Sequence, residues 1–147
     1  TTVVINGVEL EAMVDTGADF SVLTREGAFK LGLVKGEDGM VGAGEIVGLG
    51  PNSIESYLTV LDSVTIGDLT VRNAKMRVAD LNRHARFSTT GSRLDEKRTP
   101  FGEMILGADF FRSHRVLVSQ KQGLIYFTHQ GGQIFQTEGP LLAEQYE

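Results

Sequence analysis

Short apolar stretches, broken by glycine, asparagine and aspartate, run along most of the chain. Runs of this length with turn-forming residues between them are typical of β-strands rather than of helices. Near the start, apolar residues lie on both sides of Asn6-Gly7, a pair that favours a tight type I′ turn. We therefore expect a hairpin there, and two longer strands over 54–66 and 69–78.

Two short helices are expected within this β pattern. Thr24 is a suitable amino-terminal cap for a helix over 25–31, and Gly32 is suited to ending it. The apolar residues 104–106 predict a buried strand, and the second helix is expected directly after it, over 108–113.

The later part of the chain adds a hairpin and two polar segments. Apolar runs over 115–119 and 124–127 flank a glycine-containing turn and predict two paired strands. The stretch 82–98 is polar and has neither helical nor strand periodicity, so we interpret it as a surface insertion. Residues 138–147 are interpreted as a carboxy-terminal extension, which leaves one main domain over 1–137.

Composition narrows the class of protein. A chain of 147 residues is long enough for one domain with its own core. The formal net charge of −5 argues against nucleic-acid binding, which needs a basic surface. The absence of cysteine excludes a disulfide framework and a thiol nucleophile, and no stretch has the apolar length that crosses a bilayer. Because the chain opens on Thr1-Thr2 rather than on Met, we expect an excised domain or a processed product.

The most informative feature is a tetrapeptide that occurs twice. Gly-Ala-Asp-Phe is found at 17–20 and again at 107–110, and each copy follows an apolar run. The first copy is preceded by Asp15-Thr16, whereas the second is preceded by Ile105-Leu106. A repeated turn in which only the first copy is preceded by an acidic residue indicates one half of a catalytic site that needs two carboxylates. An internal duplication would explain the repeat, and a chance match of four common residues is the alternative.

Two carboxylates can hydrolyse a peptide bond without a metal or a covalent intermediate. Like charges at about 3 Å cannot both ionise, so the pair shares one proton. The charged member acts as general base towards water, and the protonated member donates to the carbonyl oxygen. In this chain Asp15 is the candidate, because Asp109 matches Asp19 of the first copy and not Asp15.

Asp15-Thr16-Gly17 after an apolar strand, with Ile105-Leu106-Gly107 further along, resembles the aspartic peptidases of the retropepsin type. Residues 124–132 are most similar to bacterial retropepsin-like domains, and the resemblance covers residues 3 to about 135. It implies a mainly all-β fold, the half-barrel of the acid proteases, with one or two short helices. It also implies an aspartic endopeptidase that acts on polypeptides and needs no cofactor.

The resemblance also implies roles for the loop residues. Asp15 is the catalytic acid, and the hydroxyl of Thr16 bonds across a subunit interface. Gly17 permits a sharp turn that brings its amide close to the carboxylate. The element Ile105-Leu106-Gly107 supports the loop from behind.

A single chain supplies only one catalytic carboxylate. Two Asp15 residues must therefore meet across the twofold axis of a homodimer, and monomers are expected to be inactive. A second similar domain in a longer native polypeptide is the alternative partner.

Substrate contacts are expected from a glycine-rich span, residues 39–50, where the resemblance implies a flap that closes over bound peptide. The residues assigned to substrate binding are Ala18, Asp19, Val47 and Gly48. For Asp19, capping of its own turn is an equally weighted alternative. Apolar subsites are expected from Val22, Val47, Ile54 and Leu106. A dinucleotide-binding loop is rejected, because the third glycine of the span comes one position late.

Other chemistries find little support. The three histidines, His84, His114 and His129, are too far apart for a recognisable metal motif, so we expect no metal site. His114 is expected at the surface or at a helix end. No Gly-x-Ser-x-Gly signature of a serine hydrolase is present.

Two further functions stay open: a non-catalytic peptide-binding module, and a dimerisation domain of a larger protein. The location is unknown, with a weak preference for a bacterial periplasm or cell envelope that follows from the resemblance alone.

Overall fold

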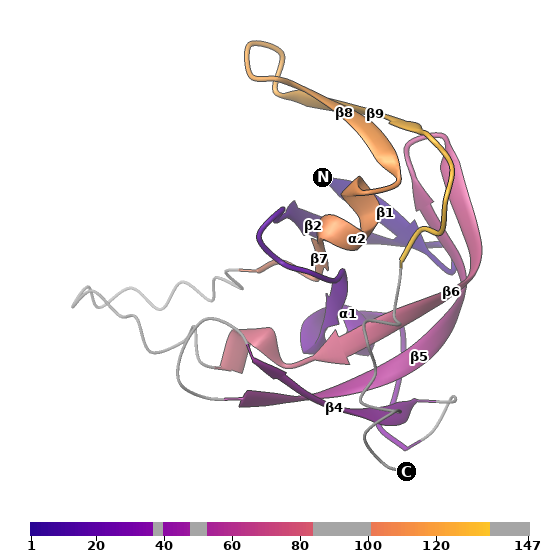
Figure 1. Ribbon diagram of the computed structural model, residues 1–147. Helices are drawn as coiled ribbons and strands as arrows, with labels where there is room; N and C mark the ends of the chain where they lie inside the picture. The colour runs from indigo at the N-terminus through magenta and orange to yellow at the C-terminus, as the bar shows by residue number, and fades with distance from the viewer. Residues whose placement is uncertain (37–39, 48–52, 84–100, 136–147) are drawn as a thin grey trace, which may run out of the picture.

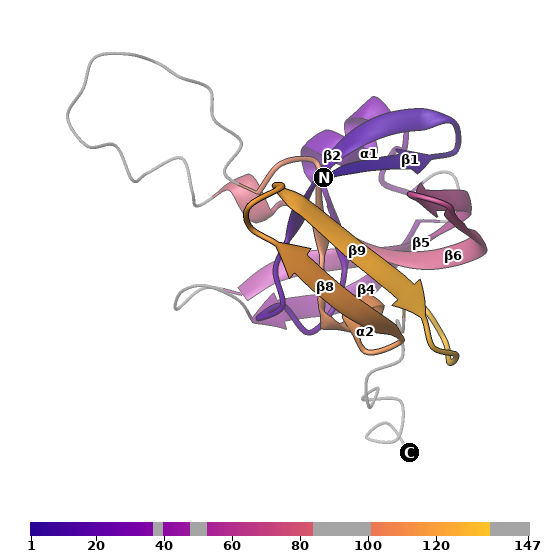
Figure 2. The same ribbon diagram turned by 90° about the horizontal axis from the view of Figure 1, so that it is seen from above.

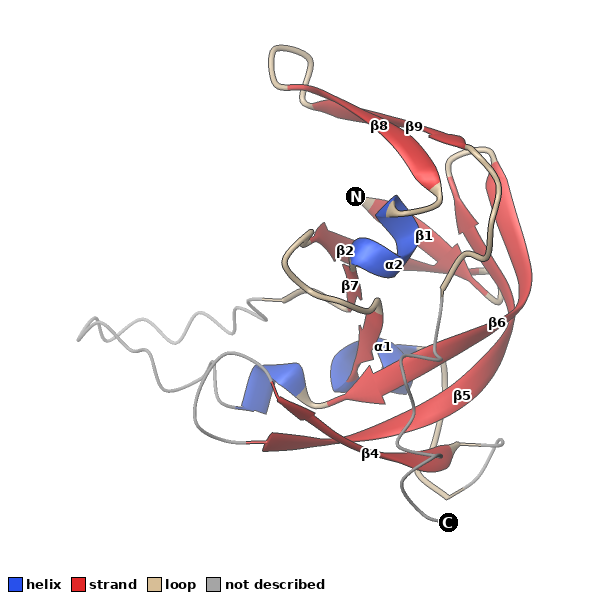
Figure 3. Ribbon diagram, viewed as in Figure 1, coloured by secondary structure: helices blue, strands red, loops and turns tan. Residues whose placement is uncertain are grey.

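The computed structural model describes residues 1–36, 40–47, 53–83 and 101–135. Strands make up most of the ribbon, with two short α-helices and one 3-10 turn (Figure 3). The elements are β1 (Thr2–Ile5), β2 (Val8–Val14), β3 (Val22–Thr24), α1 (Arg25–Lys30), β4 (Val41–Val47), β5 (Ser53–Ile66), β6 (Leu69–Ala79), η1 (Leu81–Arg83), β7 (Met104–Leu106), α2 (Ala108–Phe111), β8 (His114–Ser119) and β9 (Leu124–His129). The expectation of a mainly β fold with two short helices is confirmed.

One seven-stranded sheet forms the body of the domain, in the order β1-β2-β7-β3-β6-β5-β4 (Figure 1). The strand β1 also pairs with β5, where Val4 lies opposite Thr65 and Ile5 opposite Val64. This extra pairing curls the sheet back on itself into a half-barrel. Apolar side chains from β1, β2, β5, β6 and β7 fill its interior together with those of α2.

The short strand β7 enters this sheet between two strands from the first part of the chain. It runs parallel to β2, with Leu106 opposite Val14, and antiparallel to β3, with Ile105 opposite Val22. All three residues of β7 are buried. β7, which comes late in the sequence, is therefore flanked on both sides by the strands that carry the Asp15 loop.

Local signals explain the first hairpin and the first helix. Asn6 and Gly7 have positive φ angles of 49° and 81°, as a type I′ turn requires, so the predicted hairpin is confirmed. The hydroxyl of Thr24 accepts a hydrogen bond from the amide of Gly27 and caps α1 as predicted.

The hairpin β8–β9 stands apart from the large sheet as a separate two-stranded sheet. Figure 1 shows it projecting from one end of the domain, and Figure 2 shows its two strands side by side. Leu117 and Val118 of β8 are 64% and 60% exposed, and Leu124 of β9 is 50% exposed. The hairpin thus presents apolar side chains to solvent.

Two polar side chains are buried: Asn82, expected in a surface insertion, and His114, expected at the surface or at a helix end and found just after α2. Asn82, the first residue of the predicted polar insertion, is 1% exposed; it donates a hydrogen bond to Glu26 and accepts one from the amide of Phe101. His114 is 8% exposed and stacks on the ring of Phe110 at 4.2 Å. Both side chains are polar, and each is buried where it has hydrogen-bond partners within the fold.

Several predicted segments lie outside the described residues. They are residues 84–98 of the polar insertion, the carboxy-terminal extension over 138–147, and the part of the flap span that contains Gly39, Gly48 and Gly50.

Candidate active site

Asp15 directly follows the last residue of β2 and is half-buried. Its amide donates to the carbonyl oxygen of Leu106 at 3.0 Å, which ties the start of the loop to β7. The amide of Gly17 donates to Oδ1 of Asp15 at 2.9 Å. This bond orients the carboxylate within the turn.

The turn is compact around this carboxylate. The amide of Ala18 donates to the carbonyl oxygen of Asp15 at 3.2 Å. A Cβ at position 17 would lie 3.2 Å from Oδ1 of Asp15, which is tighter than an ordinary contact. Thr16 and Gly17 are exposed at the tip, so this face of the loop is accessible from solvent.

The second copy of the repeat packs directly behind the first. The amide of Ala108 donates to the carbonyl oxygen of Ala18 at 2.7 Å. A Cβ at position 107 would lie 2.5 Å from the backbone carbonyl of Phe20 and 2.8 Å from the oxygen of Ala18. Only glycine fits at this contact, because the obstacle is backbone rather than a flexible side chain.

A buried carboxylate, Asp109, locks the two copies together. Its Oδ1 accepts hydrogen bonds from the amide of Ser21 at 2.8 Å, from the hydroxyl of Ser21 at 2.6 Å and from the amide of Phe110 at 2.8 Å. The hydroxyl of Ser21 also accepts a bond from the amide of Gly107 at 3.0 Å. Burial raises the pKa of Asp109, and the bonds from Ser21 act against that rise.

From the sequence, Asp109 was excluded as the second catalytic acid and was given no other role. The available signal was its place in the repeat, between an alanine and a phenylalanine within an apolar stretch. An acidic residue in such surroundings is buried only when donors surround it, as they do here.

The substrate-binding candidates are spread over two elements. Asp19 has an 80% exposed side chain that lies 3.8 Å from Nη2 of Arg112. Val47 is 83% exposed at the end of β4, and Ala18 is half-buried in the turn. Gly48 lies outside the described residues.

The strand β4 pairs with β5 through an irregular register. The register shifts between Gly42 and Glu45, and Gly44 has a φ of 76°. Arg77 of β6 reaches this bulge, since its Nη1 donates to the carbonyl oxygen of Ala43 at 3.1 Å. Arg77 was not among the sequence-predicted residues, because nothing in its local sequence marks it.

Comparison with known proteins agrees with this geometry. A model of the aspartyl protease family matches residues 1–110 of the chain. The chain belongs to the aspartyl protease family. No curated protein sequence is similar enough to count as a match.

Solved structures show the retropepsin-like fold of this aspartyl protease domain. A retropepsin-like aspartic protease from Rickettsia conorii has a TM-score of 0.56 at 21% identity and covers 86% of each chain. The EIAV protease, solved with the inhibitor HBY-793, has a TM-score of 0.51 at 26% identity, over 76% of this chain and 83% of that one. The retroviral protease-like domain of Ddi1 from Leishmania major has a TM-score of 0.50 at 18% identity, over 95% and 94%.

Two of the expected apolar subsites are wrong for this aspartyl protease domain. Val22 of β3 is 5% exposed and Leu106 of β7 is 1% exposed, because β3 and β7 pair with each other inside the sheet. Both side chains are therefore almost fully buried in the fold.

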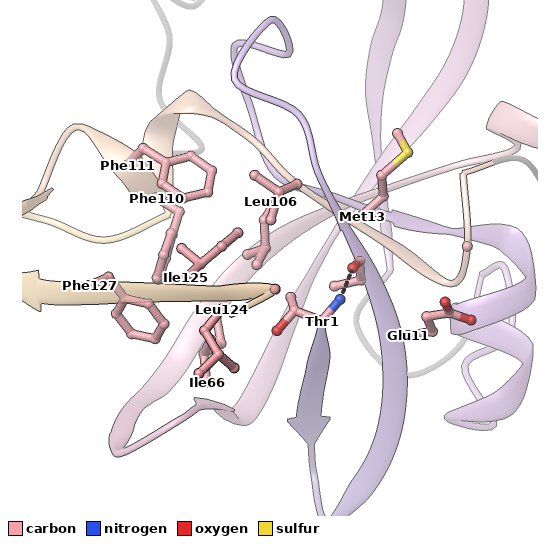
Figure 4. Close-up of a pocket in the computed structure, with 14 residues that line it drawn as sticks. Thr1, Glu11, Met13, Ile66, Leu106, Phe110, Phe111, Leu124, Ile125 and Phe127 are labelled. Atoms are coloured by element: carbon pink, nitrogen blue, oxygen red, sulfur yellow. Dashed lines mark hydrogen bonds between the residues drawn. The ribbon is translucent and has the colours of Figure 1, made fainter. Parts of the chain in front are cut away.

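A cavity of about 610 Å³ lies between β2, α2 and the hairpin β8–β9 (Figure 4). Figure 4 shows Leu106, Phe110, Phe111 and Phe127 around one part of it, and Met13 and Glu11 at another. Val14 lines the cavity, but Asp15 does not. The cavity is therefore distinct from the candidate catalytic carboxylate and is bounded by the projecting hairpin.

Within the four described stretches, no group of three or more His, Asp or Glu residues is arranged to hold a metal ion. Over the same stretches, no helix has the length and hydropathy that spanning a membrane requires.

Proposed function

We propose that this aspartyl protease domain is an endopeptidase in which two Asp15 carboxylates, one from each subunit of a homodimer, activate a water molecule. The observation that carries this proposal is the Asp15 turn itself. Asp15 is half-buried, its carboxylate is oriented by the amide of Gly17, and its backbone amide is bonded to Leu106 of β7. In the described part of the chain no Lys or Arg forms an ion pair with Asp15.

The reaction follows from a shared proton. The charged Asp15 removes a proton from water while the water oxygen bonds to the carbon of the scissile carbonyl. The protonated Asp15 of the other subunit transfers its proton to the carbonyl oxygen, which gives a neutral tetrahedral intermediate. As the C–N bond breaks, the leaving nitrogen takes a proton from one carboxyl and the intermediate returns one to the other.

The dimer requirement follows from the count of carboxylates. One chain presents one such turn, since Asp109 is buried and fully engaged with Ser21 and Phe110. We assign Thr16, exposed at the tip, to the contact between the two loops. Ile105, Leu106 and Gly107 are assigned to loop support.

The hairpin β8–β9 is the surface that we assign to dimerisation. An isolated two-stranded sheet is at best marginally stable in water, and this one exposes apolar side chains along both strands. Pairing with the same hairpin of a second copy would supply further strands and cover Leu117 and Leu124. A closed twofold contact of this kind brings identical surfaces together.

We assign substrate binding to the Asp15 turn and to β4, the strand within the expected flap span (the flap strand). Ala18 and Asp19 follow the catalytic residue, and Val47 and Gly48 end β4 and begin the segment after it. An extended peptide between these elements would pair with them as an added strand. We assign the whole function to one domain over residues 1–137, with an insertion near 82–98 and an extension over 138–147.

The proposal is tested with Asp15→Asn, which keeps the size of the side chain and removes its acid–base function. Wild type and variant are incubated with a denatured protein from acidic to neutral pH, and fragments are followed by mass spectrometry. Loss of one acid–base group is expected to lower the rate about 10²–10⁴-fold or more. Equal cleavage by both proteins would exclude Asp15 as the catalytic residue, and no cleavage by the wild type would favour a binding module.

The dimer is tested by sedimentation together with activity. We expect the active species to be a dimer, and Leu117→Glu to shift it towards monomer and lower activity in proportion, because the charge would be buried in the interface. Full activity of a strictly monomeric species would contradict a shared site.

A further inference from the structure

Arg77 lies between the flap strand and the Asp15 loop. It belongs to β6, opposite Val22 of β3 and Leu58 of β5, and its side chain is half-buried. Its guanidinium carbon is 5.5 Å from the centre of the Phe20 ring. Phe20 ends the first copy of the repeat, five positions after Asp15.

The guanidinium is only partly used by the protein. Nη1 donates to the carbonyl oxygen of Ala43 at 3.1 Å and to the hydroxyl of Ser56 at 2.8 Å. Among the described residues, Nε and Nη2 make no hydrogen bond, and no carboxylate forms an ion pair with Arg77. Three N–H groups of a fixed planar fork thus stay available.

Among the described residues, the guanidinium of Arg77 has only neutral hydrogen-bond partners, so none of them compensates its charge. A half-buried cation gains most from a carboxylate, and the chain has 19 acidic residues against 14 basic ones. Even so, no described acidic side chain pairs with it. The ring of Phe20 shields one face of the guanidinium, which strengthens a charge interaction at its free edge.

We infer that Arg77 is a specificity-determining residue that binds an acidic side chain of the peptide substrate beside Phe20. The inference rests on the proposed peptidase function. The two carboxylate oxygens of an Asp or Glu accept from Nε and Nη2, while Nη1 stays anchored to Ala43 and Ser56. The enzyme therefore prefers peptides that carry Asp or Glu at one fixed position near the scissile bond.

A purely structural role for Arg77 makes a different prediction. If the side chain only holds the bulge of β4, its replacement lowers stability and the cleavage of all peptides alike. If it binds a carboxylate, replacement changes which peptides are cleaved. Arg77→Gln removes the charge and keeps a hydrogen-bond donor, Arg77→Glu reverses the charge, and Arg77→Lys keeps the charge without the planar fork.

The experiment profiles cleavage sites by mass spectrometry in a defined mixture of synthetic peptides, followed by kcat/KM for peptide pairs that differ only by Glu or Gln. For the wild type we expect enrichment of Asp and Glu at one position and about a 10-fold preference for the Glu peptide, the effect of one charge-assisted bond of about 1.4 kcal/mol. Arg77→Gln should lose the preference and still cleave the Gln peptide. Arg77→Glu should favour Lys or Arg there.

The outcomes distinguish a failure of the proposed function from a failure of the assignment of Arg77. No cleavage by the wild type overturns the proposed function and this inference with it. Cleavage without an acidic preference, or an equal preference in wild type and Arg77→Gln, overturns the inference alone. Should Arg77→Gln fail to fold, Arg77→Lys and the wild type decide: the acidic preference must persist in the lysine variant and weaken with added salt in both. An acidic preference that changes neither with salt nor with the residue at position 77 would contradict a charge contact between Arg77 and the substrate.

Discussion

The two copies of Gly-Ala-Asp-Phe have the same sequence and opposite surroundings. In the first copy Asp19 has an 80% exposed side chain and Phe20 is half-buried. In the second copy Asp109 is 3% exposed and Phe110 is 1% exposed. One copy presents its side chains at the candidate active site, and the other supports that site from behind.

The difference arises from what covers each copy. The second copy forms α2, and Phe110 is enclosed by His114, Phe127 and Phe135. The first copy forms a turn after β2, with the second copy behind it and solvent in front. A duplicated segment can thus divide presentation and support between its copies.

The largest expected contrast is between the two phenylalanines. Phe110→Ala removes a fully buried ring and should lower the free energy of unfolding by about 3–5 kcal/mol. Phe20→Ala removes a half-exposed ring and should cost no more than about 1 kcal/mol. Denaturant unfolding of both variants measures this. Similar losses would mean that the two copies are packed alike.

The glycines sharpen the contrast between stability and activity. Gly107→Ala places a Cβ 2.5 Å from the backbone of Phe20, and we expect a loss of about 1–3 kcal/mol. Gly17→Ala places it 3.2 Å from Oδ1 of Asp15, so it should lower activity while stability stays within about 1 kcal/mol. Thermal unfolding and peptide cleavage are measured side by side. The reverse pattern would contradict the assigned roles.

The smallest expected contrast is the pH dependence of the two aspartates. Because burial raises the pKa of Asp109, the folded state holds this proton more tightly than the unfolded chain does. The contribution of Asp109 to the free energy of unfolding is therefore largest at pH values below the ordinary aspartate pKa. It is lost as the pH rises through the raised pKa of the folded state.

Asp109→Asn cannot titrate, so the stability of the wild type relative to this variant should fall over that window, by about 1.4 kcal/mol for each unit of raised pKa. Asp19→Asn is measured beside it as the matched variant, because it makes the same change at the exposed position of the first copy. Urea unfolding from pH 3 to pH 7 tests this, and parallel curves for the two variants would contradict a buried, titrating Asp109.

Local sequence determined the elements and the position of the candidate turn. The Asn6-Gly7 hairpin, the cap at Thr24 and the strand at 104–106 follow from backbone preferences and from short-range periodicity, which each residue carries wherever the chain goes. The turn at Asp15 and its Gly17 could also be predicted from the local sequence, because they directly follow an apolar strand.

Tertiary structure alone decided which residues are covered. The entry of β7 between β2 and β3 buried Val22 and Leu106, which the sequence had suggested as subsites. It also enclosed Asp109 and brought Arg77 to Phe20 and to the bulge of β4. Burial and pairing depend on segments far apart in the chain, and no local pattern records which of two identical tetrapeptides the rest of the molecule will cover.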